Sequence, residues 1–218
     1  MKSKKRAIVL TLTLILLIGG LVSATLAYFT DNEFNKDNVI TIGNVEIDLF
    51  EHSEEYTTTP DHDTLVDNDA IYQDYLDSKA NLLPGETVGK YTYIENTGKN
   101  AAYVRFTVTV PEAMNPYVDL VFNTDEFDVI PNGNVYTVVR KEALPAGEVS
   151  GCGLETVSLK ATLTEEQIAG VIASGLFTEA DRTFNITVSA EAIQTVGFNN
   201  YTEAFAAFDA NPNEKVDA

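Results

Sequence analysis

The sequence predicts an all-β domain, built as a two-sheet sandwich of Greek-key or jelly-roll type with short peripheral helices. Three observations indicate this class. Polar and apolar residues alternate with a period of two, as in the run Asn-Val-Glu-Ile-Asp-Leu at residues 44–49. The candidate strands are short and regularly spaced along the chain. Turn sequences with Pro and Gly separate several of them, as at residues 83–86.

The chain begins with the pattern of an exported protein. A basic segment at residues 2–6 precedes an apolar stretch over residues 7–22. This order predicts a signal peptide over residues 1–27. The alternative is an uncleaved membrane anchor, but the apolar stretch is short for a membrane span.

The end of this leader carries small residues at Thr25 and Ala27. Signal peptidase requires small side chains three and one residues before the cut, which places the cut before Tyr28. We therefore expect residues 28–218 to form a single secreted domain with no membrane contact after cleavage.

Aromatic residues lie directly after the predicted cut, in an otherwise polar segment. The residues that define it are Tyr28, Phe29, Thr30, Asp31 and Phe34. One interpretation makes residues 28–38 an edge strand of their own domain. The other makes them a donor strand that completes the sheet of the next subunit. Such head-to-tail contacts do not close, so they produce fibres.

The rest of the chain predicts more strands and two helices. A capping box of Thr164 and Gln167 opens a helix that ends near Ser174. Residues 200–210 predict a second helix, whose apolar stripe docks onto the domain. The further strands are expected at residues 87–96, 102–110, 118–122, 135–139, 155–163 and 183–194.

Two similar turn sequences precede predicted strands. Residues 83–86 read Leu-Pro-Gly-Glu, and residues 144–148 read Leu-Pro-Ala-Gly-Glu. Pro fixes φ and Gly permits a positive φ, as tight turns require. We interpret the pair as two turns at one end of the sandwich.

Residues 51–81 are crowded with acidic side chains and predict a long exposed excursion, with a short helix near residues 71–76. Its oxygen and imidazole groups are candidate ligands for calcium or zinc, although the spacing does not fit an EF-hand. A solvated loop without metal is the alternative, and the sequence predicts no other cofactor. The candidate ligands are His52, Asp61, His62, Asp63, Asp67 and Asp69.

Composition limits the functions that are compatible with the chain. It has 218 residues, with 33 Asp or Glu against 14 Lys or Arg and a net charge of −19. Phosphate backbones and anionic membranes repel such a chain, so we expect no nucleic-acid partner. Cations and cationic surfaces remain as partners. Further copies of the chain also remain, provided that salt screens the repulsion between them.

Reactive side chains are few. His52 and His62 are the only histidines, and neither a His-Glu-x-x-His helix nor a Gly-x-Ser-x-Gly elbow occurs. The sequence therefore predicts no enzyme, with a metallopeptidase that uses these two histidines as the alternative. The single cysteine, Cys152, rules out an intramolecular disulfide. We interpret it as a small packed residue, with an intermolecular disulfide as the alternative.

Several short motifs together resemble the TasA/camelysin family of secreted matrix proteins. The leader end at residues 24–31 reads Ala-Thr-Leu-Ala-Tyr-Phe-Thr-Asp, and residues 42–49 are similar to the first strand of the family. The Leu-Pro-Gly-Glu turn, followed by Ile-Glu-Asn-Thr-Gly at residues 94–98, resembles a central block. Residues 189–194 resemble the closing strand.

This resemblance implies a jelly-roll-like sandwich that a dedicated signal peptidase, SipW, releases to the surface of a Gram-positive bacterium. It implies a structural protein of the biofilm matrix that polymerises into fibres, donates residues 28–38 to the next subunit and associates with other matrix proteins. The alternatives are a monomeric cell-surface accessory or binding module and a camelysin-like surface metallopeptidase. The excursion at residues 51–81 is longer than the resemblance leads us to expect.

Overall fold

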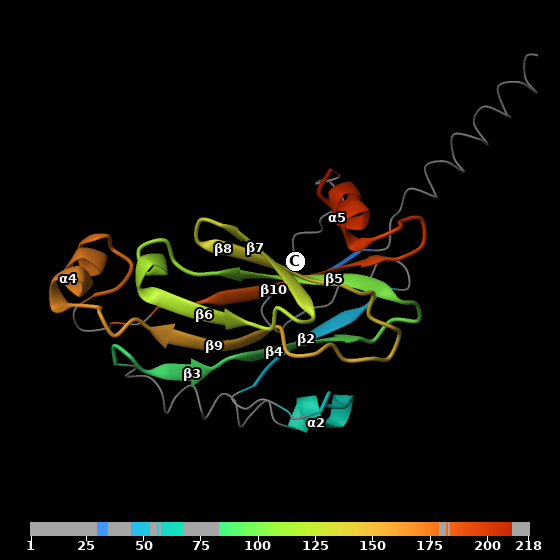
Figure 1. Cartoon of the computed structure of the whole chain (residues 1–218), viewed down its shortest axis with the longest axis horizontal. Helices are drawn as coiled ribbons and strands as arrows, with labels where there is room; N and C mark the ends of the chain where they lie inside the picture. The colour runs from blue at the N-terminus through green and yellow to red at the C-terminus, as the bar shows by residue number, and fades with distance from the viewer. Residues whose placement is uncertain are drawn as a thin grey trace, which may run out of the picture.

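The computed structural model describes residues 30–34, 45–52, 56, 58–67, 83–178, 182 and 184–210. Over these residues the chain is mostly antiparallel β-strand with a few short helices (Figure 1), which confirms the predicted all-β class. The strands are β1 (Thr30–Phe34), β2 (Ile47–His52), β3 (Thr87–Gly89), β4 (Tyr91–Asn96), β5 (Ala102–Thr109), β6 (Val118–Phe122), β7 (Phe127–Asn132), β8 (Val135–Arg140), β9 (Leu154–Leu159) and β10 (Thr187–Gln194). The helices are α2 (His62–Asp67), α4 (Glu165–Ala173), α5 (Tyr201–Ala210) and the 3-10 helix η1 (Asn115–Tyr117).

The strands form one five-stranded sheet and two smaller ones. The large sheet has the order β1-β10-β5-β8-β7, and the smaller sheets have the orders β2-β4 and β3-β9-β6. Backbone hydrogen bonds join the smaller sheets, because Lys90 N donates to Glu155 O at 2.9 Å and Gly153 N donates to Thr92 O at 2.8 Å. Figure 1 shows the result as two layers, with α5 above the large sheet and α2 below the smaller ones.

The main core lies between these layers and takes apolar side chains from all three sheets. The central strand β5 contributes Val104, Phe106 and Val108, which are buried and share one face as the alternation predicted. β2 supplies Ile47 and β9 supplies Leu154 to the same cluster. Removal of this apolar surface from water is the main favourable contribution to the free energy of folding.

Most predicted strands appear, with shifted ends. The strand expected at residues 44–49 is observed as β2, three residues further along the chain, and the strand expected at 155–163 already ends with β9. β7 was not predicted. Its sequence contains Pro131, which a strand tolerates at an edge, and β7 is indeed the edge strand of its sheet. Gly133 has a φ of 63° in the tight β7–β8 turn.

Two of the three predicted helices are confirmed. The capping box at α4 is formed, since Gln167 N donates to Thr164 Oγ1 and Thr164 N donates to Gln167 Oε1. α5 buries Phe205 and Phe208 against the large sheet, as its apolar stripe predicted. The helix expected near residues 71–76 and the signal peptide at residues 1–27 lie outside the described residues.

The two similar turns form but lie at opposite ends of one strand pair, so the prediction of a common end is wrong. Gly85 N donates to Leu159 O at 2.8 Å, whereas Gly147 N donates to Asn96 O at 2.7 Å. Residues 87–96 run antiparallel to residues 149–158. The turns at Gly85 and Gly147 are therefore separated by the length of this strand pair. Both turns need glycine, because φ is +90° at residue 85 and +74° at residue 147.

Asn96 fixes the connection between β4 and β5. It is fully buried, and its Nδ2 donates to the carbonyls of Asn100 and Leu144, at 2.9 Å in each case. Its Oδ1 accepts from Gly98 N at 3.1 Å. A buried amide is stabilising only with such partners, so Asn96 ties three backbone segments together. This gives a structural reason for the Ile-Glu-Asn-Thr-Gly motif.

Part of the acidic excursion packs against the sheet, so the prediction of an exposed segment is wrong at Leu65, although Asp61, His62 and Asp63 are exposed. Leu65 of α2 is fully buried in a cluster with Tyr93, Val149 and Cys152. β4 is therefore covered on both faces. Cys152 is 6% exposed and lies in this cluster, which agrees with its interpretation as a small packed residue.

We predict that Gly153→Ala destabilises the domain. A Cβ at this position would lie 2.3 Å from Cε1 of Phe106 and would push the layers apart. Overpacking of this kind costs about 1–3 kcal/mol. Urea unfolding measures the free energy of unfolding.

The matched control is Gly170→Ala in the interior of α4, where the new Cβ would meet no other described atom within 4 Å outside the adjoining residues and the backbone of the helix itself. That substitution should stabilise by about 0.5–1 kcal/mol, because Ala favours a helix over Gly. Equal effects of the two substitutions would contradict the packing argument.

Candidate functional site

The segment after the predicted cut contains β1, one of the two edge strands of the large sheet. β1 pairs antiparallel with β10, from Thr30 opposite Ile193 to Phe34 opposite Ser189. Of the residues predicted as edge or donor strand, the structure places Thr30, Asp31 and Phe34 in β1. In this chain the segment therefore pairs with its own domain, as the edge-strand interpretation expects. The predicted cleavage residues Thr25, Ala27 and Tyr28, and also Phe29, lie outside the described residues.

The register of β1 places acidic residues opposite core alanines. Asp31 lies opposite Ala192 and Glu33 lies opposite Ala190, and both alanines are 0% exposed. Residues that lie directly opposite on neighbouring strands share a face of the sheet, so these acidic positions belong to the core face. Natural edge strands use such charged positions to resist pairing with foreign strands. The backbone ladder attaches β1 to β10 over five register pairs.

On the side away from β1, β10 is firmly built into the domain. It pairs with β5 along its whole length, from Thr187 opposite Thr109 to Gln194 opposite Ala102. Val188 and Ala190 are buried in the main core. β10 consequently pairs with β5 along one edge and with β1 along the other.

A second polar cluster joins α2 to the outer face of β2 and β4. His62 Nδ1 lies 2.7 Å from Glu95 Oε2, and the Glu95 side chain is only 8% exposed. Asp48 lies directly opposite Glu95 on the neighbouring strand. Burial raises the pKa of the Asp48 carboxyl above its usual value, and repulsion by Glu95 and Glu46 adds to this. The cluster thus sets a histidine beside two adjacent carboxyl groups.

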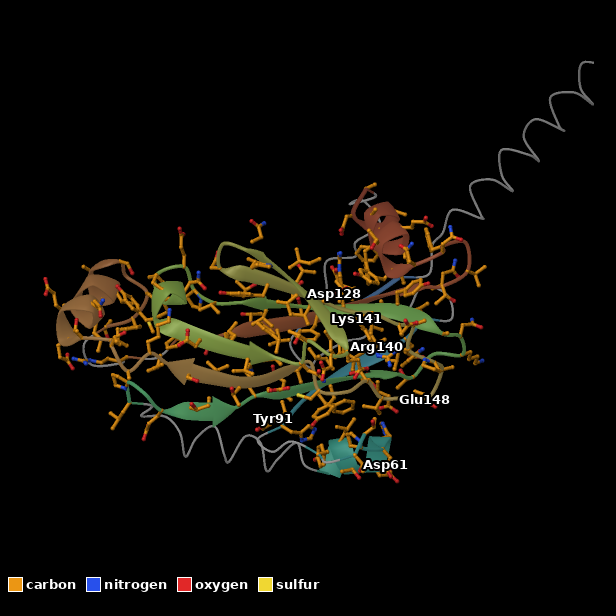
Figure 2. The ribbon with its side chains drawn as sticks, in the orientation of Figure 1. Asp61, Tyr91, Asp128, Arg140, Lys141 and Glu148 are labelled. Atoms are coloured by element: carbon orange, nitrogen blue, oxygen red, sulfur yellow. The ribbon has the colours of Figure 1, made fainter. Side chains whose placement is uncertain are left out.

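The candidate metal ligands are divided between different environments. His52 is buried among aromatic rings, with centroids 5.5 Å from Tyr56 and 6.0 Å from Tyr93. Asp61 is exposed at the start of α2, on the outer side of the molecule (Figure 2), and its Oδ1 accepts from Thr64 N at 2.9 Å. Asp63 is also exposed.

Over the part of the chain that the structure describes, no three His, Cys, Asp or Glu side chains are arranged to hold a metal ion. Asp69 and the side chain of Asp67 lie outside that part. His62 instead pairs with Glu95, and hydrogen bonds to Thr64 are the main cause that lowers the pKa of Asp61.

Sequence reasoning did not identify Asp48 and Glu95 as partners of the excursion. Asp48 was placed only on the polar side of an alternating strand, and Glu95 was noted only within a motif. The hydrogen bond from His62 to Glu95 spans 33 residues. A local pattern cannot indicate a contact of that separation, because it depends on how the excursion folds back over the sheet.

No family model, curated protein or solved structure matches this chain. In the described residues, no helix has the length and apolar character needed to cross a membrane. The relationship to the TasA/camelysin family therefore remains a prediction from the sequence motifs.

We predict that the His62–Glu95 pair stabilises the docking of α2 most at mildly acidic pH. The hydrogen bond to Glu95 is the main cause that raises the pKa of His62 above its usual 6.5. Because the folded-state pKa is raised, this contribution is complete below pH 6.5 and is lost as the pH rises through the folded-state pKa. NMR titration of the His62 ring should give a midpoint above 6.5.

Glu95→Gln keeps the size of the side chain and removes its charge. In that variant the midpoint should fall towards the usual value. An unchanged midpoint would show that Glu95 is not the cause of the shift, and His62→Gln assigns the resonance.

Proposed function

We propose that this chain is a secreted structural subunit of an extracellular matrix, which assembles into fibres by adding its N-terminal strand to the sheet of the next subunit. The pairing of β1 with β10 carries the proposal. It brings residues just beyond the predicted cut to an edge of the large sheet. Cleavage before Tyr28 would release the chain end that leads into this strand.

The pairing within one chain supports β10 as the acceptor for pairing between chains. A strand from another copy can make the same backbone hydrogen bonds to β10 that β1 makes, so exchange conserves most of the bonding free energy. Each subunit then gives one strand and accepts one. Such a contact is head-to-tail, and it generates an open filament unless the rotation between subunits closes a ring.

We further propose that the two layers form a jelly-roll or Greek-key sandwich. Strands distant in sequence are neighbours in the large sheet, where β10 lies between β1 and β5. The connection from β5 to β8 passes through β6 of the other layer and then β7. Such crossings between layers are typical of these folds.

Export, family and surroundings follow from the sequence motifs. The leader fits release by a SipW-type signal peptidase into the matrix or onto the surface of a Gram-positive bacterium. The net charge of −19 makes copies repel one another until salt screens the charge. Other matrix proteins with cationic surfaces are suitable additional partners.

One observation favours a second candidate, a monomeric surface module that accompanies fibres made by a related protein. β1 completes the edge of its own sheet, so a single chain already satisfies β10. In that case the chain stays monomeric at high concentration and associates with fibres without forming them.

We predict that fibre growth requires the N-terminal segment. A chain that starts at Tyr28 should form fibres at moderate ionic strength, and a chain that starts after Asn38 should not, because it has no strand to donate. Negative-stain electron microscopy of both proteins at equal concentration is the measurement. Equal fibres from both would exclude the donor-strand mechanism.

We also predict that cysteines introduced at one register position will link different subunits. Phe34 lies opposite Ser189 in the β1–β10 ladder. Chains that carry only Phe34→Cys, mixed with chains that carry only Ser189→Cys, should form mixed disulfide dimers under oxidising assembly conditions. Non-reducing electrophoresis with chains of two sizes detects them.

The control combines Phe34→Cys with Val121→Cys, an exposed position on β6 of the other layer. It should give few mixed dimers. Mixed dimers at the same yield in both combinations would indicate random collision rather than strand exchange.

A further inference from the structure

Helix α5 lies over a row of paired positions that crosses the large sheet from strand to strand. Asp128 of β7 lies opposite Val139 of β8, and Val139 lies opposite Arg105 of β5. Arg105 lies opposite Glu191 of β10, and Glu191 lies opposite Asn32 of β1. The row thus crosses all five strands. Since paired positions share a face, it lies on the outer face, beneath α5.

The first turn of α5 is attached to the β7 end of this row. The hydroxyl of Tyr201 donates a hydrogen bond to Oδ2 of Asp128, and Figure 2 shows Asp128 below α5. Further along the helix, Phe205 packs in one buried cluster with Val139 of β8 and Ile193 of β10. One helix therefore contacts residues of three different strands.

Arg105 attaches the end of α5 to β5 and β10. Its guanidinium makes a two-pronged pair with Asp209, at 2.9 Å and 2.6 Å, and its Nε donates to Glu191 at 2.6 Å. The rings of Phe205 and Phe208 lie 4.3 Å and 5.4 Å from its carbon Cζ. A nearly buried guanidinium needs such partners, because an unpaired buried charge is strongly destabilising. Arg105 consequently links α5, β5 and β10.

We propose that α5 is a clamp that holds β7, β8, β5 and β10 together as one unit, so that β10 keeps its place when β1 leaves and another strand binds. The proposal rests on the proposed function, for which it explains how the acceptor edge stays formed. The row ends on β1 at Asn32, whereas Glu191 of the neighbouring strand β10 accepts a hydrogen bond from Arg105, which Asp209 of α5 also binds. The clamp thus preorganises the acceptor and lowers the cost of strand exchange.

Hydrogen–deuterium exchange of the full chain tests the clamp without requiring fibres. In the unmodified protein, amides of β1 should exchange at least about tenfold faster than those β10 amides that bond to β5, because β1 opens locally. In Asp209→Asn, the protection of these β10 amides should fall by roughly tenfold, since charge-assisted hydrogen bonds to Arg105 are weakened.

Asp119→Asn on β6 is the matched control, with the same change of charge at a side chain that is 60% exposed, against 51% for Asp209. It should leave β10 unchanged. If Asp209→Asn does not fold, Tyr201→Phe removes only the hydroxyl at the other end of α5 and should raise the exchange of β7. Equal exchange of β1 and β10 in the unmodified protein, or unchanged protection in the folded clamp variant, would overturn the clamp.

The two proposals fail separately. A chain that never forms fibres but shows the expected exchange pattern keeps the clamp and contradicts the assembly function. Fibres of normal growth rate from Asp209→Asn, together with unaltered exchange, contradict only the clamp.

Discussion

The backbone groups on the outer edge of β10 need hydrogen-bond partners, and much of the structure follows from that requirement. β5 satisfies one edge of β10 along eight residues, and β1 satisfies the other along five. An unpaired strand edge attracts foreign strands, so a subunit must either cover it or use it for assembly. The same edge can serve both purposes, because the hydrogen bonds are the same whichever chain supplies the strand.

The remaining features keep this edge in place. Phe106 packs closely against Gly153 and brings the layers together, while Asn96 holds the connection into the central strand β5. On the outer face, α5 contacts β7, β8 and β10, and Arg105 connects the helix to β5 and β10. These contacts thus hold β10 and β5 firmly within the domain.

The acidic excursion makes contacts that local sequence patterns do not predict. Its composition is typical of a solvated loop, yet Leu65 is fully buried and His62 reaches Glu95 on β4. The same carboxylates and histidines that suggested a metal site serve other roles where they are described: Asp61 accepts a hydrogen bond at the start of α2, and His52 packs among aromatic rings. Ligand density in a sequence does not determine geometry, because each side chain can instead pair with a residue far along the chain.

The sequence by itself determined the all-β class, the positions of most strands, the capping box of α4 and the docking face of α5. Each of these depends on residues within a few positions of one another, where periodicity and capping act. It also located the segment that contains β1. Only the tertiary structure decided that β10 is its partner, that Glu95 receives His62, and that Arg105 binds Asp209 over 104 residues. Those contacts arise when packing of the core brings distant segments together, and no local pattern encodes their separation.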